Sequence, residues 1–302
     1  MQLGFVSAIL PELSLDEVLR IAAEESFDSV EVMCWPPGRA QRKFAGVTHI
    51  NCTDLSSAAA DDIGALVEKH GVAISGLGYY PNPLSGDEAE AETALAHLKR
   101  VIAAAPRLGL KNVNTFIGAD HRLNSEENFA RFRQVWPDVI RHAEDHDVYI
   151  GIENCPMLFT FDEWPAGKNL AYSPAVWRRM FETIPSDHFG LNFDPSHCII
   201  LMIDYLAPLY EFRHKLFHLH AKDMKIDRRK LNDRGILGLG WTTPKVPGLG
   251  EIDWAAFVST LTDVGYDGHV AIEVEDDAFA GSLERRINSL RVARNVLRPL
   301  IP

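Results

Sequence analysis

Short β-rich runs alternate with helical patterns along the whole chain, and this alternation limits the possible folds more than any other feature. The runs are rich in branched and aromatic residues, which favours strands, and the segments between them are long enough for helices. Ser14 and Glu17 have the spacing of a capping box and predict the start of the first helix. We predict eight strands, over residues 2–7, 29–33, 72–76, 112–117, 149–154, 189–194, 216–222 and 270–274.

Strands that alternate with helices pair in parallel, and eight such units in 302 residues match a TIM barrel, an α/β fold. A doubly wound open sheet is the alternative, but it normally carries a glycine-rich phosphate-binding turn after its first strand. Here that position reads Ala-Ile-Leu-Pro-Glu. No Pro- or Ser-rich linker divides the chain, so we predict a single (β/α)8 domain over residues 1–302.

Three of the predicted connections at the catalytic end of the barrel are unusually long. They are the loops after the second, fifth and seventh strands, and the last of them contains glycine and proline. After the sixth strand we expect one helical stretch near residues 199–210. The long loops suggest a bulky substrate site or one covered by a partner, either a second copy of the chain or another subunit over the barrel mouth.

The charge of the chain indicates which partners to expect. There are 30 Lys and Arg residues against 42 Asp and Glu residues, a net charge of −12, which disfavours nucleic acid and anionic membranes. We therefore expect a small-molecule partner. No signal peptide or transmembrane segment is visible, and the four cysteines show no CxxC spacing. These observations predict a cytoplasmic protein.

Charged side chains stand at the ends of the later strands. In a barrel, alternate residues point into the lumen, and active sites lie at the C-terminal ends of the strands. In the fifth strand, Ile150 and Ile152 suit the helix layer, which turns Glu153 inward. The same alternation turns Asn192 and Asp194 inward in the sixth strand.

The seventh and eighth strands extend this pattern. The alternation directs His218, His220 and Lys222 inward in the seventh strand and Glu273 inward in the eighth. Burying two glutamates, an aspartate and a histidine together is costly without a cation. Three carboxylates and one imidazole suit Mn²⁺, Mg²⁺ or Co²⁺. The alternative is that Asp194 and Glu273 merely pair with Lys222 or an arginine.

At these strand ends the chain resembles the xylose isomerase-like TIM-barrel superfamily. That superfamily includes sugar phosphate isomerases and epimerases, tagatose and psicose 3-epimerases, inosose dehydratases and endonuclease IV-type nucleases. The resemblance covers nearly the whole chain. The motifs that carry it, in order, are Gly151-Ile152-Glu153-Asn154, Asn192-Phe193-Asp194-Pro195-Ser196-His197, His218-Leu219-His220-Ala221-Lys222-Asp223, Pro247-Gly248-Leu249-Gly250-Glu251-Ile252-Asp253-Trp254 and Ile272-Glu273.

The resemblance implies a role for each of these residues. Glu153, Asp194, His220 and Glu273 would hold the divalent metal, for which we expect Mn²⁺, with Mg²⁺, Co²⁺ or Zn²⁺ as alternatives. Glu153 and Glu273 would also be the catalytic acid/base pair across the substrate carbon, and His197 would bind a substrate oxygen. The predicted function is a metal-dependent sugar isomerase or epimerase, which removes a proton next to a carbonyl by way of a metal-stabilised enediolate.

One departure from the epimerases leaves a second function open. Epimerases usually carry an arginine a few residues after the seventh-strand histidine, but here that stretch reads Lys222-Asp223-Met224-Lys225-Ile226-Asp227. The alternative is a metal-dependent lyase or dehydratase that acts on a keto-sugar, an inosose or a 3-keto-glycoside by β-elimination, including C- or O-deglycosylation. An endonuclease IV-like enzyme fits less well, because it would need more histidine ligands and a basic surface.

Five further residues are candidate substrate contacts besides His197. Asn192 and Lys222 come from the strands, and Lys222 also suits a position behind His220. His121, His49 and Trp35 come from loops at the catalytic end. A solvated position is the simpler interpretation for the two loop histidines, and a tryptophan there either stacks on a sugar or packs against the barrel rim.

Overall fold

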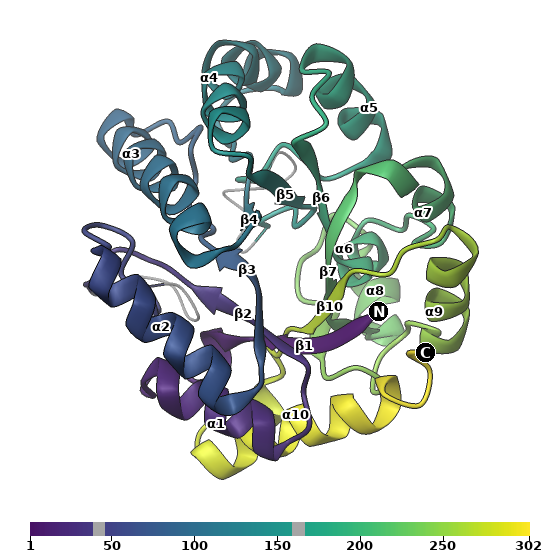
Figure 1. The fold of residues 1–302 in the computed structure, drawn as a ribbon. Coiled ribbons are helices and arrows are strands. Elements are labelled where there is room, and N and C mark those ends of the chain that lie inside the picture. Colours follow the sequence, from purple (N-terminus) through teal and green to yellow (C-terminus); the bar gives the residue numbers. More distant parts are fainter. Residues whose placement is uncertain (39–45, 159–166) are drawn as a thin grey trace.

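The computed structural model describes residues 1–38, 46–158 and 167–302. Its barrel strands are β1 (Gln2–Val6), β2 (Ser29–Met33), β3 (Ala73–Gly78), β4 (Asn112–Thr115), β5 (Tyr149–Glu153), β6 (Phe189–Phe193), β7 (Leu216–Ala221) and β10 (His269–Ile272). Within the described ranges these eight parallel strands close into a barrel, because β1 pairs with both β2 and β10. The predicted TIM barrel is confirmed, and Figure 1 shows the ring of helices around it.

The first outer helix begins where its capping residues predict. Ser14 Oγ accepts a hydrogen bond from Glu17 N (3.3 Å), and the Glu17 carboxylate accepts one from Ser14 N (2.8 Å), so the predicted capping box is confirmed. The helices are α1 (Leu15–Glu24), α2 (Ser57–His70), α3 (Glu88–Ala104), α4 (Ser125–Asp145), α5 (Pro174–Thr183), α9 (Trp254–Asp263) and α10 (Leu283–Leu297).

Alternate strand residues face these helices and form the main core. Val30, Val32, Ile150 and Ile152 are fully buried there, as the alternation predicts. At Gly4 the paired strands β1 and β2 leave no room for a side chain, because a Cβ atom would lie 2.4 Å from the carbonyl oxygen of Ser29. Glycine is therefore required at this position of β1.

The prediction of one helical stretch near residues 199–210 is wrong. Two short helices stand there, α6 (Pro195–Ile200) and α7 (Ala207–Glu211). Between them Met202 has a φ of 55°, which lies outside the range of a right-handed helix. Pro208 accounts for the break, because a proline inside a continuous helix removes a hydrogen-bond donor and collides with the preceding turn.

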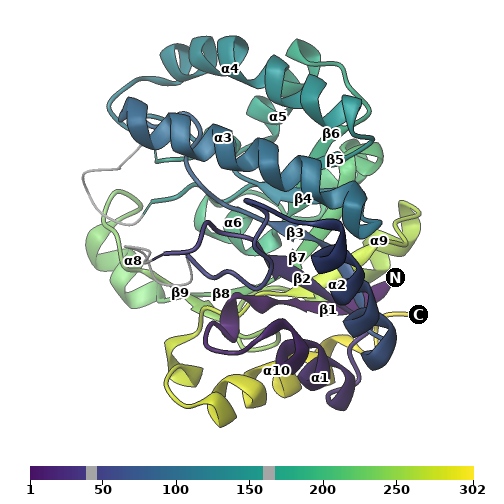
Figure 2. The same ribbon diagram turned by 60° about the vertical axis from the view of Figure 1, so that its left-hand side comes forward.

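The segment after β7 holds secondary structure where a loop was expected. β8 (Asp223–Ile226) pairs antiparallel with β9 (Thr242–Lys245), and α8 (Arg228–Arg234) lies between them. Figure 2 shows this hairpin at the end of the barrel opposite the two termini. It therefore lies over the C-terminal ends of the strands. The long loops predicted after the second and fifth strands include residues 39–45 and 159–166, which lie outside the described residues.

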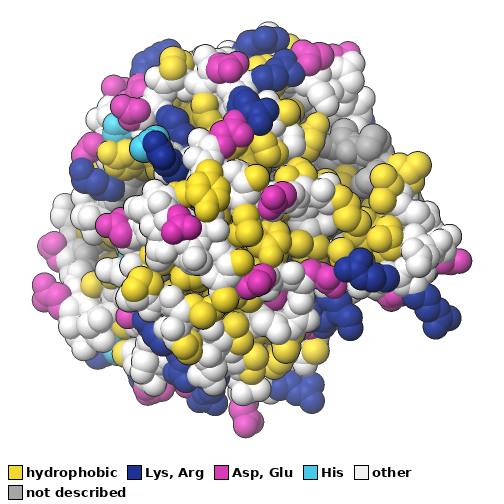
Figure 3. Space-filling view, turned by 90° about the vertical axis from the view of Figure 1, so that its right-hand side faces the viewer, with side chains coloured by type: hydrophobic (Ala, Val, Ile, Leu, Met, Phe, Trp, Pro, Cys, Tyr) yellow, Lys and Arg dark blue, Asp and Glu magenta, His cyan; other side chains and the backbone are white. Residues whose placement is uncertain are grey.

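No helix of the described chain is long and apolar enough to cross a membrane. The face shown in Figure 3 carries acidic and basic side chains interspersed with one another, with hydrophobic side chains between them. Neither the acidic nor the basic side chains form a continuous patch in that view.

Asp223 ties the end of β7 to the segment that leads to α9. Its carboxylate is fully buried. A Cβ atom at Gly250 would lie 2.2 Å from Asp223 Oδ1, so the glycine allows the loop to approach this closely. The carboxylate accepts five hydrogen bonds, from the backbone N–H groups of Met224, Gly248, Gly250 and Ile252 and from the indole of Trp254.

We expect Asp223→Ala to lower the free energy of unfolding by about 3–5 kcal/mol, because several buried N–H groups lose their acceptor. Urea denaturation measures this loss. Asp227→Ala is the matched control, since Asp227 caps the exposed helix α8 and its loss should have a much smaller effect. Equal effects of the two substitutions would contradict the role given to Asp223.

Candidate metal centre

A cavity of about 520 Å³ opens at the C-terminal end of the barrel, between the strand ends and the β8–β9 hairpin. Two kinds of residue line it. The charged group is Glu153, His197, Lys222, Glu273, Glu275 and Asp277, and the apolar group includes Val6, Met33, Trp35, Phe116, Met157, Met224, Leu239 and Trp241. The charged residues belong to the β5–β10 side of the barrel. The apolar ones come from both sides: Val6, Met33, Trp35 and Phe116 make the β1–β4 side apolar, and Met157, Met224, Leu239 and Trp241 come from later segments.

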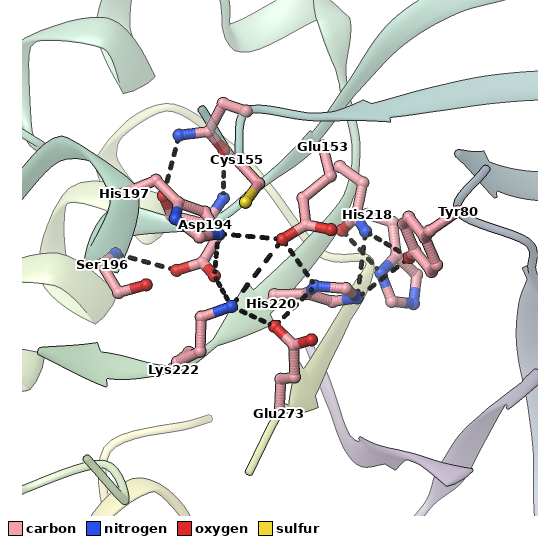
Figure 4. A network of polar contacts seen from close by, with 12 residues as sticks. Tyr80, Glu153, Cys155, Asp194, Ser196, His197, His218, His220, Lys222 and Glu273 are labelled. Atoms are coloured by element: carbon pink, nitrogen blue, oxygen red, sulfur yellow. Dashed lines mark hydrogen bonds and ion pairs between the residues drawn. The ribbon is translucent and has the colours of Figure 1, made fainter. Parts of the chain in front are cut away.

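The four predicted metal ligands come together beside this cavity. Glu153 is the last residue of β5, Asp194 directly follows β6, His220 lies in β7, and Glu273 directly follows β10. One ligand atom from each lies within 4.8 Å of the others. Parallel strands end at the same edge of the barrel, which is why residues so distant in sequence meet (Figure 4).

The imidazole of His220 faces the two glutamates through Nδ1. This atom lies 3.7 Å from Glu153 Oε1 and 3.4 Å from Glu273 Oε2. It is fully buried and has no hydrogen-bond partner among the described residues. Asp194 Oδ2 is buried as well, and its partners are the cationic groups of Lys222 and His197. A buried imidazole nitrogen without a hydrogen-bond partner, beside three carboxylates, is the arrangement expected where a cation binds.

Lys222 contacts the same carboxylates. Its Nζ lies 2.6 Å from Glu273 Oε2, 3.1 Å from Asp194 Oδ2 and 3.3 Å from Glu275 Oε2. The ion pairs of Asp194 and Glu273 with Lys222, which the sequence offered as the alternative to a metal site, are therefore present. One ammonium group nevertheless faces more than one buried negative charge.

The pKa values of three carboxyl groups shift in different directions here. Burial and the charge of Glu273 together raise the pKa of Glu275 in spite of Lys222. Burial would also raise the pKa of Glu153, but its hydrogen bond with His197 and the nearby charge of Lys222 hold it well below its ordinary value. Burial opposes ionisation of Asp194 too, yet Lys222 and His197 lower its pKa to about 2. These two carboxylates are therefore ionised at neutral pH.

His197 is placed at the floor of the cavity by α6, directly after Asp194. Its Nε2 lies 3.0 Å from Glu153 Oε1 and 3.2 Å from Asp194 Oδ2. It lines the cavity, as a substrate contact must. Trp35 also lines the cavity, and its ring packs edge-on against Tyr79 with the centroids 5.0 Å apart.

Three other predicted contacts are placed differently. Asn192 is fully buried beneath the cavity, where its amide lies 3.0 Å from the hydroxyl of Tyr80. His49 bonds to Ser7 Oγ through Nδ1 (2.9 Å) and to the carbonyl of Leu10 through Nε2 (3.1 Å). Neither Asn192, His49 nor His121 is among the described residues that line the cavity.

Glu31 is a site residue that the sequence analysis overlooked. It lies in β2, is fully buried, and its Oε2 is 2.6 Å from His220 Nε2. The signal was available, because Val30 and Val32 suit the helix layer and so turn Glu31 inward by the alternation applied to the later strands.

A family model described as the xylose isomerase-like TIM barrel matches residues 19–299. The chain belongs to this family. Protein YfiH of Bacillus subtilis is 24% identical over 304 residues, which span 91% of this chain and 93% of YfiH. An inosose dehydratase of Clostridium perfringens is 32% identical over 104 residues, or 33% of this chain and 35% of that enzyme.

Solved structures share the fold over nearly their whole length. The IolI protein with a bound zinc atom has a TM-score of 0.74 and 20% identity over 99% of both chains. D-psicose 3-epimerase of Clostridium cellulolyticum H10, solved with D-tagatose, has a TM-score of 0.69 and 15% identity over 100% of this chain and 99% of the other. At such identities the likeness establishes the fold.

We expect Lys222→Met to destabilise the metal-depleted protein by about 3–5 kcal/mol, because buried carboxylates lose their ammonium partner. Thermal unfolding in EDTA measures this. Added Mn²⁺ should restore part of the lost stability if a cation can take over the compensating charge. Lys245→Met is the matched control, since Lys245 pairs with Asp276 at 3.0 Å. A Lys222→Met protein as stable as the wild type in EDTA would contradict this electrostatic interpretation.

Proposed function

We propose that this protein is a divalent-metal-dependent sugar isomerase or epimerase that moves a proton at the carbon next to a carbonyl group. One observation carries the proposal: the buried Glu153 and the partly buried Glu273 stand with Asp194 and His220 around one point at the mouth of the barrel. The epimerase and dehydratase among its relatives support the same class of chemistry.

The residues fit a divalent cation. Three carboxylates and one imidazole are a hard donor set, and His220 Nδ1 lacks a hydrogen-bond partner among the described residues. When bound, the cation would polarise the substrate carbonyl and stabilise the negative charge that develops there. We propose Mn²⁺, with Mg²⁺, Co²⁺ or Zn²⁺ able to occupy the same donor set; the zinc in the IolI structure supports a divalent ion of this kind.

The two glutamates are suited to proton transfer from different sides of the cavity. Glu153 ends β5 and Glu273 follows β10, with β6 and β7 between them in the barrel. The hydrogen bond from His197 and the charge of Lys222 favour the ionised form of Glu153, so it can accept a proton at neutral pH. Epimerisation needs a second group on the opposite face of the substrate carbon, and we assign that role to Glu273.

The neighbouring polar residues would orient the substrate. His197 lines the cavity beside Glu153 and can bind a substrate oxygen. Lys222 holds the carboxylate of Glu273 at 2.6 Å, and its ammonium can also bind a substrate oxygen. Trp35 offers an aromatic surface on the apolar side.

A second copy of the chain or a partner subunit over the mouth of the barrel stays a prediction from the sequence. The cytoplasmic location also stays a prediction.

A second candidate function is a lyase that acts on a 3-keto-glycoside. The apolar side of the cavity favours it, because a free ketose carries hydroxyl groups all round and would leave some of them unpaired against Met33, Trp35 and Phe116. A glycoside could place its sugar over the carboxylates and an apolar aglycone against those side chains. One glutamate would remove the proton at C2, the C1–aglycone bond would break, and the leaving group would take up a proton.

The metal assignment predicts that metal-depleted protein binds one Mn²⁺ per chain. His220→Ala should weaken this binding at least about 10–100-fold. Loss of a group that hydrogen-bonds to a metal ligand has an effect of this size, and loss of the ligand itself should have no smaller effect. His49→Ala is the matched control and should keep the affinity, because His49 bonds to Ser7 Oγ and the Leu10 carbonyl, outside the proposed ligand set. Equilibrium dialysis with metal analysis measures both. Unchanged affinity in His220→Ala would refute the ligand assignment.

The acid/base assignment predicts that Glu153→Gln and Glu273→Gln each lose turnover by roughly 10²–10⁴-fold. The measurement is deuterium incorporation from D₂O into a panel of ketoses, inososes and 3-keto-glycosides with Mn²⁺ present. Glu251→Gln is the control, since Glu251 pairs with Arg228 at 3.0 Å and lies outside the cavity lining described above.

The same panel separates the two candidate functions. An epimerase returns the deuterated epimer and needs both glutamates. A lyase releases the aglycone and needs one glutamate for proton removal. Exchange at the wild-type rate in both glutamine variants would show that neither glutamate is the base.

A further inference from the structure

We propose that Glu31 is the positioning residue for His220, which it holds with Nδ1 directed at the metal site. Glu31 does this as the centre of a closed hydrogen-bond network in the barrel lumen, beneath the cavity. The inference rests on the proposed metal site. The other members of the network are Ser75, Tyr80, Asn192 and His218.

Both carboxylate oxygens of Glu31 have a donor. Oε2 lies 2.6 Å from His220 Nε2, and Oε1 accepts a hydrogen bond from the hydroxyl of Tyr80. Glu31 and His220 are fully buried, and Tyr80 is buried as well. An ionised carboxylate can only accept hydrogen bonds, so the hydrogen of the Glu31–His220 contact belongs to Nε2. In the neutral form that a metal ligand requires, the imidazole then carries its lone pair on Nδ1, the atom that faces Glu153 and Glu273.

The rest of the network agrees with this assignment. Asn192 Oδ1 can only accept, so His218 Nδ1, 3.0 Å away, carries a hydrogen. His218 Nε2 then accepts from the hydroxyl of Ser75 at 3.0 Å. The amide nitrogen of Asn192 donates to the Tyr80 oxygen at 3.0 Å, which leaves the Tyr80 hydrogen for Glu31. Asn192 Nδ2 also lies 3.0 Å from His220 Nε2, but both atoms bear hydrogen, so they form no bond with each other.

A second cation is the competing interpretation of the same residues. One ligand atom from each of Glu31, His218 and His220 lies within 4.8 Å of the others. A cation there would need a lone pair from both histidines. His218 uses both nitrogens in hydrogen bonds, and His220 Nε2 would have to give up the hydrogen that it donates to Glu31. The geometry therefore favours the positioning role.

A carboxylate behind a metal-ligating histidine has two physical effects. It fixes the orientation of the ring and selects which nitrogen is free, and its charge raises the basicity of the ligand nitrogen. Both effects act on the metal affinity. They need no contact between Glu31 and the substrate, and Glu31 is not among the described residues that line the cavity.

The first test is the Mn²⁺ affinity and stoichiometry of Glu31→Gln, which keeps the shape of the side chain and removes its charge. We expect one Mn²⁺ per chain with about 10–100-fold weaker binding. Glu25→Gln is the matched control, since Glu25 is a buried carboxylate that pairs with Arg291 (2.6 Å) instead. Glu25→Gln should bind Mn²⁺ as the wild type does.

The second test is a spectroscopic signature that a general loss of stability would not produce. In ¹⁵N-histidine-labelled protein loaded with Zn²⁺, the Nε2–H proton of His220 should resonate far downfield, because it is donated to a charged carboxylate. In Glu31→Gln it should move upfield. If Glu31→Gln does not fold, Tyr80→Phe removes one donor to Glu31, and its Mn²⁺ affinity should fall by roughly 2–10-fold.

Three results would overturn the inference. These are an affinity of Glu31→Gln within twofold of the wild type, an unchanged Nε2–H resonance, or two metal ions per wild-type chain that fall to one in Glu31→Gln. The last result would support the second cation site. A wild-type protein that binds no divalent metal would instead refute the proposed function on which the inference rests.

Discussion

The concentration of buried negative charge at the mouth of the barrel is the constraint on which the rest of the site depends. Glu153, Asp194 and Glu273 converge there, and Glu275 adds a fourth carboxyl group. Charges buried in this way must be compensated, because the interior solvates them far less well than water. The ammonium of Lys222 compensates part of the charge, and a divalent cation would compensate the rest.

The fold explains how such a cluster can be held in place. Each of the four proposed ligands lies at or next to the end of a different parallel strand, so the barrel sets their separation and the loops do not. Glu31 supports His220 from below, and Asp223 ties the loop after the hairpin to the end of β7. Apolar side chains of the β1–β4 side, such as Met33 and Phe116, also line the cavity.

Strand alternation was enough to predict the barrel and to bring Glu153, Asp194, His220 and Glu273 together, because inward residues at strand ends must meet in a closed barrel. The same rule turns Glu31 of β2 inward, but it does not show which residue Glu31 contacts. The contact between Glu31 and His220 joins β2 to β7, which are not neighbours in the barrel, and no local pattern encodes it. The positions of His49 and Asn192 also depend on tertiary hydrogen bonds, which a sequence pattern does not contain.

The most direct test of the central claim is anomalous diffraction at the manganese edge from crystals of the protein grown with Mn²⁺. The proposal predicts one anomalous peak per chain, bounded by Glu153, Asp194, Glu273 and Nδ1 of His220, with the ammonium of Lys222 moved away from at least one carboxylate. A site without a peak, in which Lys222 still pairs with the carboxylates as it does here, would contradict it.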